Sequence, residues 1–189
     1  MNRRPVRILF LTCLALIACQ GRSASSEPSP ERRVTIEVKD AHGKTTARVV
    51  SGHPCRATVD GIELLVGGRP LVAQVGETVW NGNDAANGTT LSQNGHPVAR
   101  IHANQLFDSE GVPLVRVMDN GDIGNPAGQI VRKAVITASK VTIGDVTVTG
   151  TSNVALAAML TAPEVNAEIR ALAACHYLLP ADPSEEKTP

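Results

Sequence analysis

The stretch from Thr90 to Ile136 contains one sequence unit three times: TLSQNGHPVARIHAN (90–104), QLFDSEGVPLVRVMDN (105–120) and GDIGNPAGQIVRKAVI (121–136). Each unit has a short apolar start, a four-residue turn that ends in glycine, and an apolar strand. Ser, Asp or Asn opens each turn, where its side chain bonds the turn backbone, and the closing glycine accepts a positive φ. The pattern predicts three successive hairpin turns of type I within an antiparallel meander.

The same turn chemistry recurs closer to the N-terminus. An alternating segment, residues 34–39, is followed by Asp40-Ala41-His42-Gly43 and a return strand, which predicts another hairpin. A Gly-x-Pro-apolar phrase begins at Gly68, Gly95 and Gly111 and indicates duplication of a hairpin. Because proline has no backbone donor, each copy is expected at an outward-facing or bulged position. The predicted turn glycines are Gly43, Gly68, Gly95, Gly111 and Gly128.

Three further dipeptides predict tight connections: Asp60-Gly61, Asn120-Gly121 and Gly144-Asp145. We expect a type I′ turn at Asn120-Gly121, because both of its central residues need positive φ and Asn-Gly tolerates this. Residues 81–90 consist of Asn, Gly, Asp, Ala and Thr and are predicted to be the longest polar loop of the domain.

After residue 152 the hydrophobic period changes to that of a helix. Residues 153–160 predict a short helix. The next four residues, Thr161 to Glu164, have the pattern of a capping box, in which the Thr hydroxyl accepts from an amide of a new helix and Glu164 reaches back. That second helix is expected to end before Pro180 and to bury one face, formed by Val165, Ile169, Leu172 and Ala173.

These elements predict a mainly β fold with C-terminal helices (α+β). We expect a single domain over residues 34–179, in which an antiparallel β-hairpin meander curls into a sandwich or an open barrel. A two-helix C-terminal element is expected to pack on the sheet. Residues 180–189 are acidic and contain proline, and are expected to form a disordered tail.

The N-terminus carries the parts of an export signal. Arg3, Arg4 and Arg7 form a basic region, and the apolar region after it is too short to span a bilayer. It ends in Leu16-Ile17-Ala18-Cys19, which resembles the lipobox of bacterial lipoproteins. The resemblance implies a signal peptide over residues 1–18 and lipidation of Cys19 on a flexible tether, residues 19–33. The alternative is an ordinary secretory signal with a chance cysteine.

The residue after the lipobox cysteine bears on the expected location. It is Gln20 rather than Asp, which by the sorting rule of such lipoproteins implies the outer membrane. The membrane is then a partner through the lipid anchor, and a protein of the cell envelope is a further candidate partner.

Composition argues against several classes of function. The signal removes three of 18 basic residues and none of the 18 acidic ones, so the mature chain has a net charge of about −3 and lacks a basic patch for nucleic acid. Two Phe, one Trp and one Tyr are too few for a carbohydrate-binding face. The sequence has no P-loop, Rossmann fingerprint or Gly-x-Ser-x-Gly motif. We expect no cofactor and no nucleic-acid partner.

The chain has four cysteines. Cys13 leaves with the signal and Cys19 takes the lipid, so Cys55 and Cys175 are expected to form a disulfide in an oxidising compartment. The alternative is a tetrahedral zinc site made by His53, Cys55, Cys175 and His176. The adjacent pair Cys175-His176 fits that site poorly, because neighbouring residues cannot easily face one metal ion, and we expect no metal.

Four arginines follow the turn glycines at similar spacing: Arg48, Arg100, Arg116 and Arg132. They are expected to be the solvent-facing row of a sheet, the alternative being a basic stripe for an anionic partner. The chain therefore predicts a lipid-anchored, non-catalytic binding or structural module of the cell envelope. The alternative is an envelope enzyme or metal-binding protein that uses His53, Cys55, Cys175 and His176.

Overall fold

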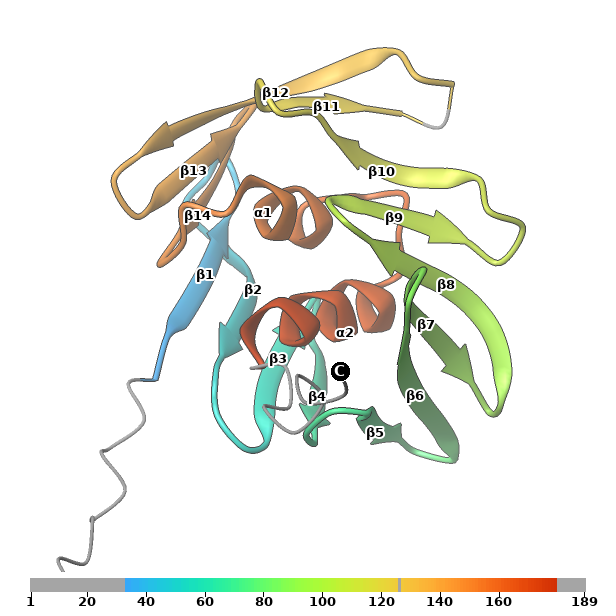
Figure 1. Cartoon of the computed structure of the whole chain (residues 1–189). Helices are drawn as coiled ribbons and strands as arrows, with labels where there is room; N and C mark the ends of the chain where they lie inside the picture. Colours follow the sequence, from blue (N-terminus) through green and yellow to red (C-terminus); the bar gives the residue numbers. More distant parts are fainter. Residues whose placement is uncertain (1–32, 126, 180–189) are drawn as a thin grey trace, which may run out of the picture. The chain divides into compact units, whose positions relative to one another are not determined.

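The computed structural model describes residues 33–125 and 127–179 (Figure 1). The predicted signal peptide, Cys19, nearly all of the tether and the C-terminal tail lie outside the described residues. The described chain forms 14 strands and then two helices. The strands are β1 (Thr35–Lys39), β2 (Thr45–Val50), β3 (Cys55–Val59), β4 (Ile62–Val66), β5 (Leu71–Val75), β6 (Thr78–Ala85), β7 (Gly88–Gln93), β8 (His96–His102), β9 (Gln105–Asp108), β10 (Pro113–Val117), β11 (Asp122–Gly124), β12 (Ile130–Thr137), β13 (Lys140–Ile143) and β14 (Val146–Thr149).

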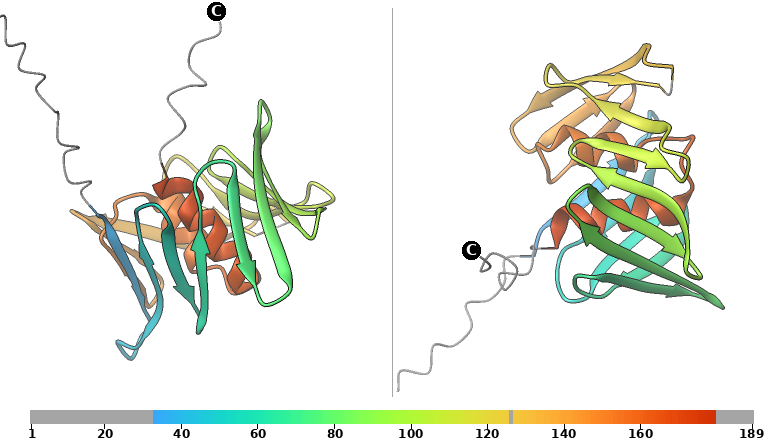
Figure 2. Two further views of the ribbon diagram at one scale, coloured as in Figure 1. Left: turned by 90° about the horizontal axis from the view of Figure 1, so that it is seen from below. Right: turned by 45° about the vertical axis from the view of Figure 1, so that its right-hand side comes forward.

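The strands form a single antiparallel sheet of order β4-β3-β2-β1-β14-β13-β12-β11-β10-β9-β8-β7-β6-β5. Nearly every strand pairs with its neighbours in sequence, and the long-range pairing is that of β1 with β14. The two end strands, β4 and β5, meet through one isolated bridge between Gly67 and Val72, and we call this line the seam. The sheet curls into a nearly closed barrel (Figure 2). The predicted antiparallel β fold with C-terminal helices is confirmed.

The two helices, α1 (Val154–Leu160) and α2 (Ala167–Leu178), lie inside the curl of the sheet (Figures 1 and 2). α2 packs against β2, β3 and β4, and α1 packs against α2, β10 and β13. The prediction that the second helix buries one face is wrong, because every residue from Ile169 to Cys175 is buried. An enclosed helix has no solvent side, and the alanines of α2 allow its neighbours to approach closely.

All five predicted turn glycines have positive φ, at Gly43 (77°), Gly68 (42°), Gly95 (82°), Gly111 (84°) and Gly128 (77°). The turn around Asp108 shows the expected side-chain bonds, since its carboxylate accepts from the amides of Glu110 at 2.9 Å and Val112 at 2.8 Å.

Two predicted turn types are exchanged. Asn94 and Gly95 both have positive φ, so this turn is type I′ rather than type I. At Asn120-Gly121 only the glycine has positive φ, and its amide donates to the carbonyl of Met118 at 2.9 Å, so this turn is type I rather than type I′. Asparagine tolerates both conformations, and the sequence therefore does not choose between them.

Two of the three prolines in the repeated phrase lie at bulges. The register shifts between β7 and β8 where Pro97 faces Ser92, and between β9 and β10 next to Pro113. Both positions agree with the expectation for a residue without a backbone donor. Pro70 differs, because it lies between β4 and β5 at the seam, where the sheet is interrupted. The copy of the phrase that begins at Gly68 is therefore not part of a paired hairpin.

Residues 81–90 are not a loop, contrary to prediction. They complete β6 and begin β7, with a turn at Ala86-Asn87. The segment has a polar sequence because its inward-facing position is a glycine. Asn81 and Asn83 alternate with the buried Gly82, where a Cβ would lie 2.8 Å from the Leu71 side chain. Only a glycine fits this inward position, so the strand lacks the apolar residue that would reveal it.

The predicted capping box is also wrong. Thr161 ends α1 instead of starting α2, and its hydroxyl donates to the carbonyls of Ala157 at 2.9 Å and Ala158 at 3.3 Å. α2 starts later, after Asn166, whose side-chain oxygen accepts from the amide of Ile169 at 2.8 Å. A threonine followed three residues later by glutamate fits the motif by sequence, but asparagine caps at least as well.

Candidate functional site

The structure brings Cys55 and Cys175 together. Their sulfurs lie 2.06 Å apart and their Cα atoms 5.9 Å apart, which is compatible with the expected disulfide. Cys55 begins β3 and Cys175 lies near the end of α2, and both side chains are fully buried. The pair therefore joins the enclosed helix to the wall of the barrel.

His53 and His176, the other two residues of the alternative zinc site, do not converge on the cysteine pair. His53 is exposed ahead of β3, whereas the Nδ1 atom of His176 lies 3.2 Å from the hydroxyl of Thr89. Sulfurs at bonding distance are not thiolates, the form in which cysteine binds metals. Among the described residues no group of three or more His, Cys, Asp or Glu side chains is placed to hold a metal ion.

A polar cluster that sequence reasoning missed lies near the end of α2. It consists of Arg69 at the seam, Asp84 on β6, Thr89 on β7 and His176 on α2, and we call it the seam cluster. The Thr89 hydroxyl donates to the Asp84 carboxylate and lies 3.2 Å from Nδ1 of His176. The Arg69 guanidinium pairs with Asp84 at 3.1 Å and donates to the backbone carbonyl of His176 at 2.5 Å.

The hydrogen bonds of the seam cluster fix the tautomer of His176. A hydroxyl has one hydrogen, and Thr89 gives it to the Asp84 carboxylate, which can only accept. The Thr89 oxygen must therefore accept from Nδ1–H of His176, and a neutral imidazole then leaves Nε2 as its acceptor nitrogen. Burial, aided by the positive charge of Arg69 and opposed by Asp84, lowers the pKa of His176 to about 4. The imidazole is thus neutral at pH 7.

The neighbouring Tyr177 is held in the same region. Its hydroxyl donates to the carbonyl of Ala103 at 2.8 Å, and burial raises its pKa to about 12. The rings of His176 and Tyr177 meet edge to face, with centroids 5.4 Å apart. The C-terminal turn of α2 is therefore tied by side chains to the seam, to the β6–β7 hairpin and to the β8–β9 turn.

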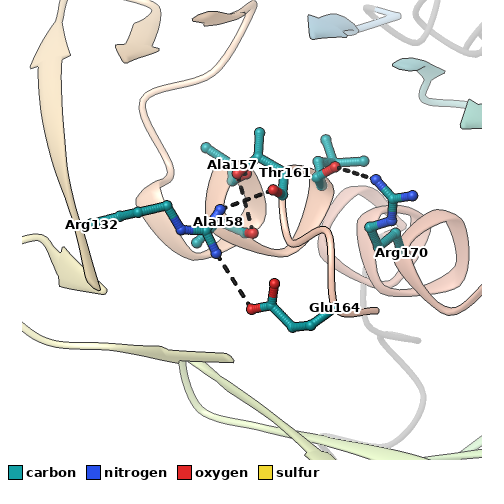
Figure 3. A network of polar contacts seen from close by, with 7 residues as sticks. Arg132, Ala157, Ala158, Thr161, Glu164 and Arg170 are labelled. Atoms are coloured by element: carbon teal, nitrogen blue, oxygen red, sulfur yellow. Dashed lines mark hydrogen bonds and ion pairs between the residues drawn. The ribbon is translucent and has the colours of Figure 1, made fainter. Parts of the chain in front are cut away.

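Two more arginines bind backbone carbonyls at the C-terminal end of α1 (Figure 3). Arg132 on β12 donates to the carbonyl of Thr161 at 2.9 Å and approaches Glu164 at 3.5 Å. Arg170 on α2 donates to the carbonyl of Leu160 at 3.2 Å and pairs with Asp60 in the β3–β4 turn. The last carbonyls of a helix lack partners within the helix, and positive charge is favourable there. The guanidinium groups of Arg132 and Arg170 supply both the missing hydrogen-bond donors and the positive charge at the end of α1.

The four arginines that follow the turn glycines do not form one stripe. Arg132 reaches the helices, as described above, and Arg48 lies 3.7 Å from Glu37 on the neighbouring strand. Arg100 stacks over Phe107, with its guanidinium carbon 5.0 Å from the ring centre. β2 and β8 are also far apart in the order of the sheet. The expectation of a solvent-facing row is therefore wrong for Arg132.

Comparison with protein-family models, with characterised proteins and with solved structures gives no match. Neither helix in the described ranges has the length and apolar character needed to cross a bilayer. The charged groups described above have a structural role. They hold α1 and α2 against the barrel wall through the side chains of Arg69, Asp84, Arg132 and Arg170.

Proposed function

We propose that the protein is a lipid-anchored protein of the cell envelope whose domain is a non-catalytic binding or structural module. The observation that carries this proposal is the N-terminal sequence, in which the parts of a lipoprotein signal follow one another in the expected order. A basic region and an apolar region lead directly to Leu16-Ile17-Ala18-Cys19, as in the lipobox of bacterial lipoproteins. The following Gln20 favours the outer membrane.

The cysteine pair supports the oxidising compartment that the proposal requires. Cys55 and Cys175 lie at disulfide distance across 120 residues of sequence. Disulfides form and persist in exported proteins and are rare where thiols are kept reduced. A domain built around such a pair is suited to the cell envelope.

The packing of the domain supports a module rather than an enzyme. α1 and α2 occupy the inside of the curled sheet, together with inward-facing aliphatic residues. Arg69 of the seam cluster and the buried Arg170 each bind a backbone carbonyl, and they pair with the carboxylates of Asp84 and Asp60 respectively. A rigid, filled barrel presents its outer surface for binding, and its interior groups serve to hold that surface in shape.

The anchor is tested by labelling cells with radioactive palmitate. Wild-type protein is expected to carry label, and Cys19→Ser is expected to lose it, since the thioether needs the Cys19 sulfur. Lipid chains also supply membrane affinity, at about 0.8 kcal/mol per buried CH₂ group. Cys13→Ser is the matched control, because it removes a cysteine from the same signal and should leave labelling unchanged.

Retention of label in Cys19→Ser would refute the anchor. A stoichiometric metal ion in the purified protein would instead favour the metal-binding alternative. Crosslinking in intact cells, followed by identification of the captured protein, would show which envelope component the domain contacts.

A further inference from the structure

The seam is a break in the hydrogen bonding of the barrel wall. A single bridge joins β4 to β5, in which the amide of Gly67 donates to the carbonyl of Val72 at 2.9 Å and the amide of Val72 donates back at 3.2 Å. In an antiparallel ladder the next pair after this bridge would be Leu65 with Gln74, and β4 and β5 do not form it. A strand ladder therefore does not hold the seam closed.

The last turn of α2 lies between the two sides of the seam. The body of the helix packs against β2, β3 and β4, which form one side. On this side Cys175 meets Cys55 of β3 at disulfide distance, and Cys55 faces Val66 of β4. The next two residues of the helix, His176 and Tyr177, contact the other side. We call Cys175, His176 and Tyr177 the strap.

Three side-chain contacts connect the strap to the second side and to the seam itself. Nδ1 of His176 lies 3.2 Å from the Thr89 hydroxyl on β7. The Tyr177 hydroxyl donates to the carbonyl of Ala103, in the β8–β9 turn, at 2.8 Å. Arg69, in the β4–β5 connection, donates to the His176 carbonyl at 2.5 Å. Consecutive residues of one helical turn thus bridge a gap that the sheet leaves open.

We propose that the seam is a gate in the barrel wall and that the strap keeps it closed. When the strap is released, β4 and β5 separate as one local unit while the rest of the sheet stays paired. Proteins open locally where few interactions hold an element in place. The seam has one bridge, whereas ladders join the other neighbouring strands of the sheet order. Opening exposes the edges of β4 and β5, which the closed barrel covers.

The strap can be released without unpacking α2. Residues 169–175 of the helix are buried, whereas His176 and Tyr177 are partly exposed. The ends of helices fray, since their last carbonyls lack partners within the helix. Fraying of this turn breaks the contacts to Thr89 and Ala103 and leaves the body of α2 against β3. The gate depends on the fold alone and not on the lipid anchor at Cys19.

Amide hydrogen exchange, followed residue by residue by NMR in the purified protein, tests the gate. The amides of Gly67 and Val72 bond across the seam and exchange when it opens. The amide of Ala134 donates to the Gly121 carbonyl at 3.0 Å, between β11 and β12, and reports on the rest of the sheet.

The variant Thr89→Val with Tyr177→Phe removes both hydrogen bonds from the strap to the second side. Exchange at Gly67 and Val72 is expected to become about tenfold faster, the order of effect for two lost hydrogen bonds, with no change at Ala134. Tyr177→Phe alone removes one hydroxyl and should accelerate the same two amides about two- to tenfold. This single change keeps the test valid if the double variant does not fold.

Arg132→Gln is the matched control. It also removes a side-chain bond that ties a helix to the wall, in this case the bond of 2.9 Å to the Thr161 carbonyl at the end of α1. Because this contact lies away from the seam, exchange at Gly67 and Val72 should stay as in wild type.

The gate is overturned by any of three results. Equal acceleration at Ala134 in the strap variants would mean that the seam opens only when the whole barrel unfolds. Unchanged exchange at Gly67 and Val72 would show that the strap does not hold the seam. Acceleration of these two amides by Arg132→Gln as large as that by the strap variants would show that they report on general stability.

Discussion

The wall at β2–β4 and the wall at β11–β12 belong to one sheet, but they differ in what lies behind them. Leu64 on β4 faces α2 and is fully buried, whereas Ile136 on β12 also faces inward and is 53% exposed. Both strands have the apolar residues that a half-buried strand needs. Alternation thus indicates which side of a strand faces inward, and the placement of the helices decides which inward residues are buried.

The largest expected effect comes from separating α2 from its wall. Cys55→Ala with Cys175→Ala should lower the free energy of unfolding by about 4–5 kcal/mol, because the closed loop spans 120 residues and its entropy returns to the unfolded chain. Urea unfolding of the variant and of wild type, each with and without reductant, measures this. A loss below about 1 kcal/mol would show that the pair does not fasten α2, because even short loops are expected to give more.

The second prediction compares the two walls directly. Leu64→Ala should cost about 2–5 kcal/mol, since it removes a fully buried side chain packed in the α2-backed wall. Ile136→Ala removes a side chain of similar size from the uncovered wall and should cost less than about 1 kcal/mol. The midpoints of urea unfolding give both values. Equal costs would mean that β12 is covered in solution, for example by a second copy of the chain.

The smallest effect concerns the end of α2 and depends on pH. The pKa of His176 is about 4 in the folded protein, against 6.5 for a solvated imidazole such as that of the unfolded chain, so the unfolded chain binds more protons between these values. The stability that His176 contributes is therefore complete above pH 6.5 and is lost as the pH falls toward 4. With allowance for solvent screening, the loss should be on the order of 1–2 kcal/mol.

Chemical denaturation at a series of pH values measures this loss. His176→Gln should flatten the profile between pH 6.5 and 4, while His53→Gln, at an exposed histidine, should leave it unchanged. An identical slope in wild type and His176→Gln would show that the imidazole is hydrated in the folded protein.

The hairpins could be predicted because turns are local. Asp108 bonds the two amides that its type I turn presents, and the residues needed for this lie within four positions. The segment 81–90 could not be recognised as strand, because Gly82 is fixed by its distance to Leu71, a residue of another strand. Local pattern also placed the start of α2 wrongly at Thr161, because Asn166, which caps the helix in the structure, is an equally good capping residue.

The polar clusters could not be predicted for a different reason. Thr89 and His176 meet only because β7 and the end of α2 face each other across the barrel. The cysteine pair was an exception, since exclusion of Cys13 and Cys19 left only one pairing. No such counting applies to arginines: Arg69, Arg132 and Arg170 bind backbone carbonyls whose positions depend on the whole fold.

The pairing of β1 with β14 has a consequence for how the chain folds. Glu37 faces Thr149, so the first strand to be synthesised gains its second neighbour only after nearly all of the barrel wall has been made. The helices that fill the interior are synthesised later still. Local hairpins can form as the chain emerges, but closure requires contacts between the two ends of the sequence. This one long-range closure is expected to be slow compared with the formation of the local hairpins, because its loop entropy is lost before the contact forms. Until then the barrel has unpaired edges and an unfilled interior, and exposed strand edges and apolar surface of this kind make unfinished chains prone to aggregation.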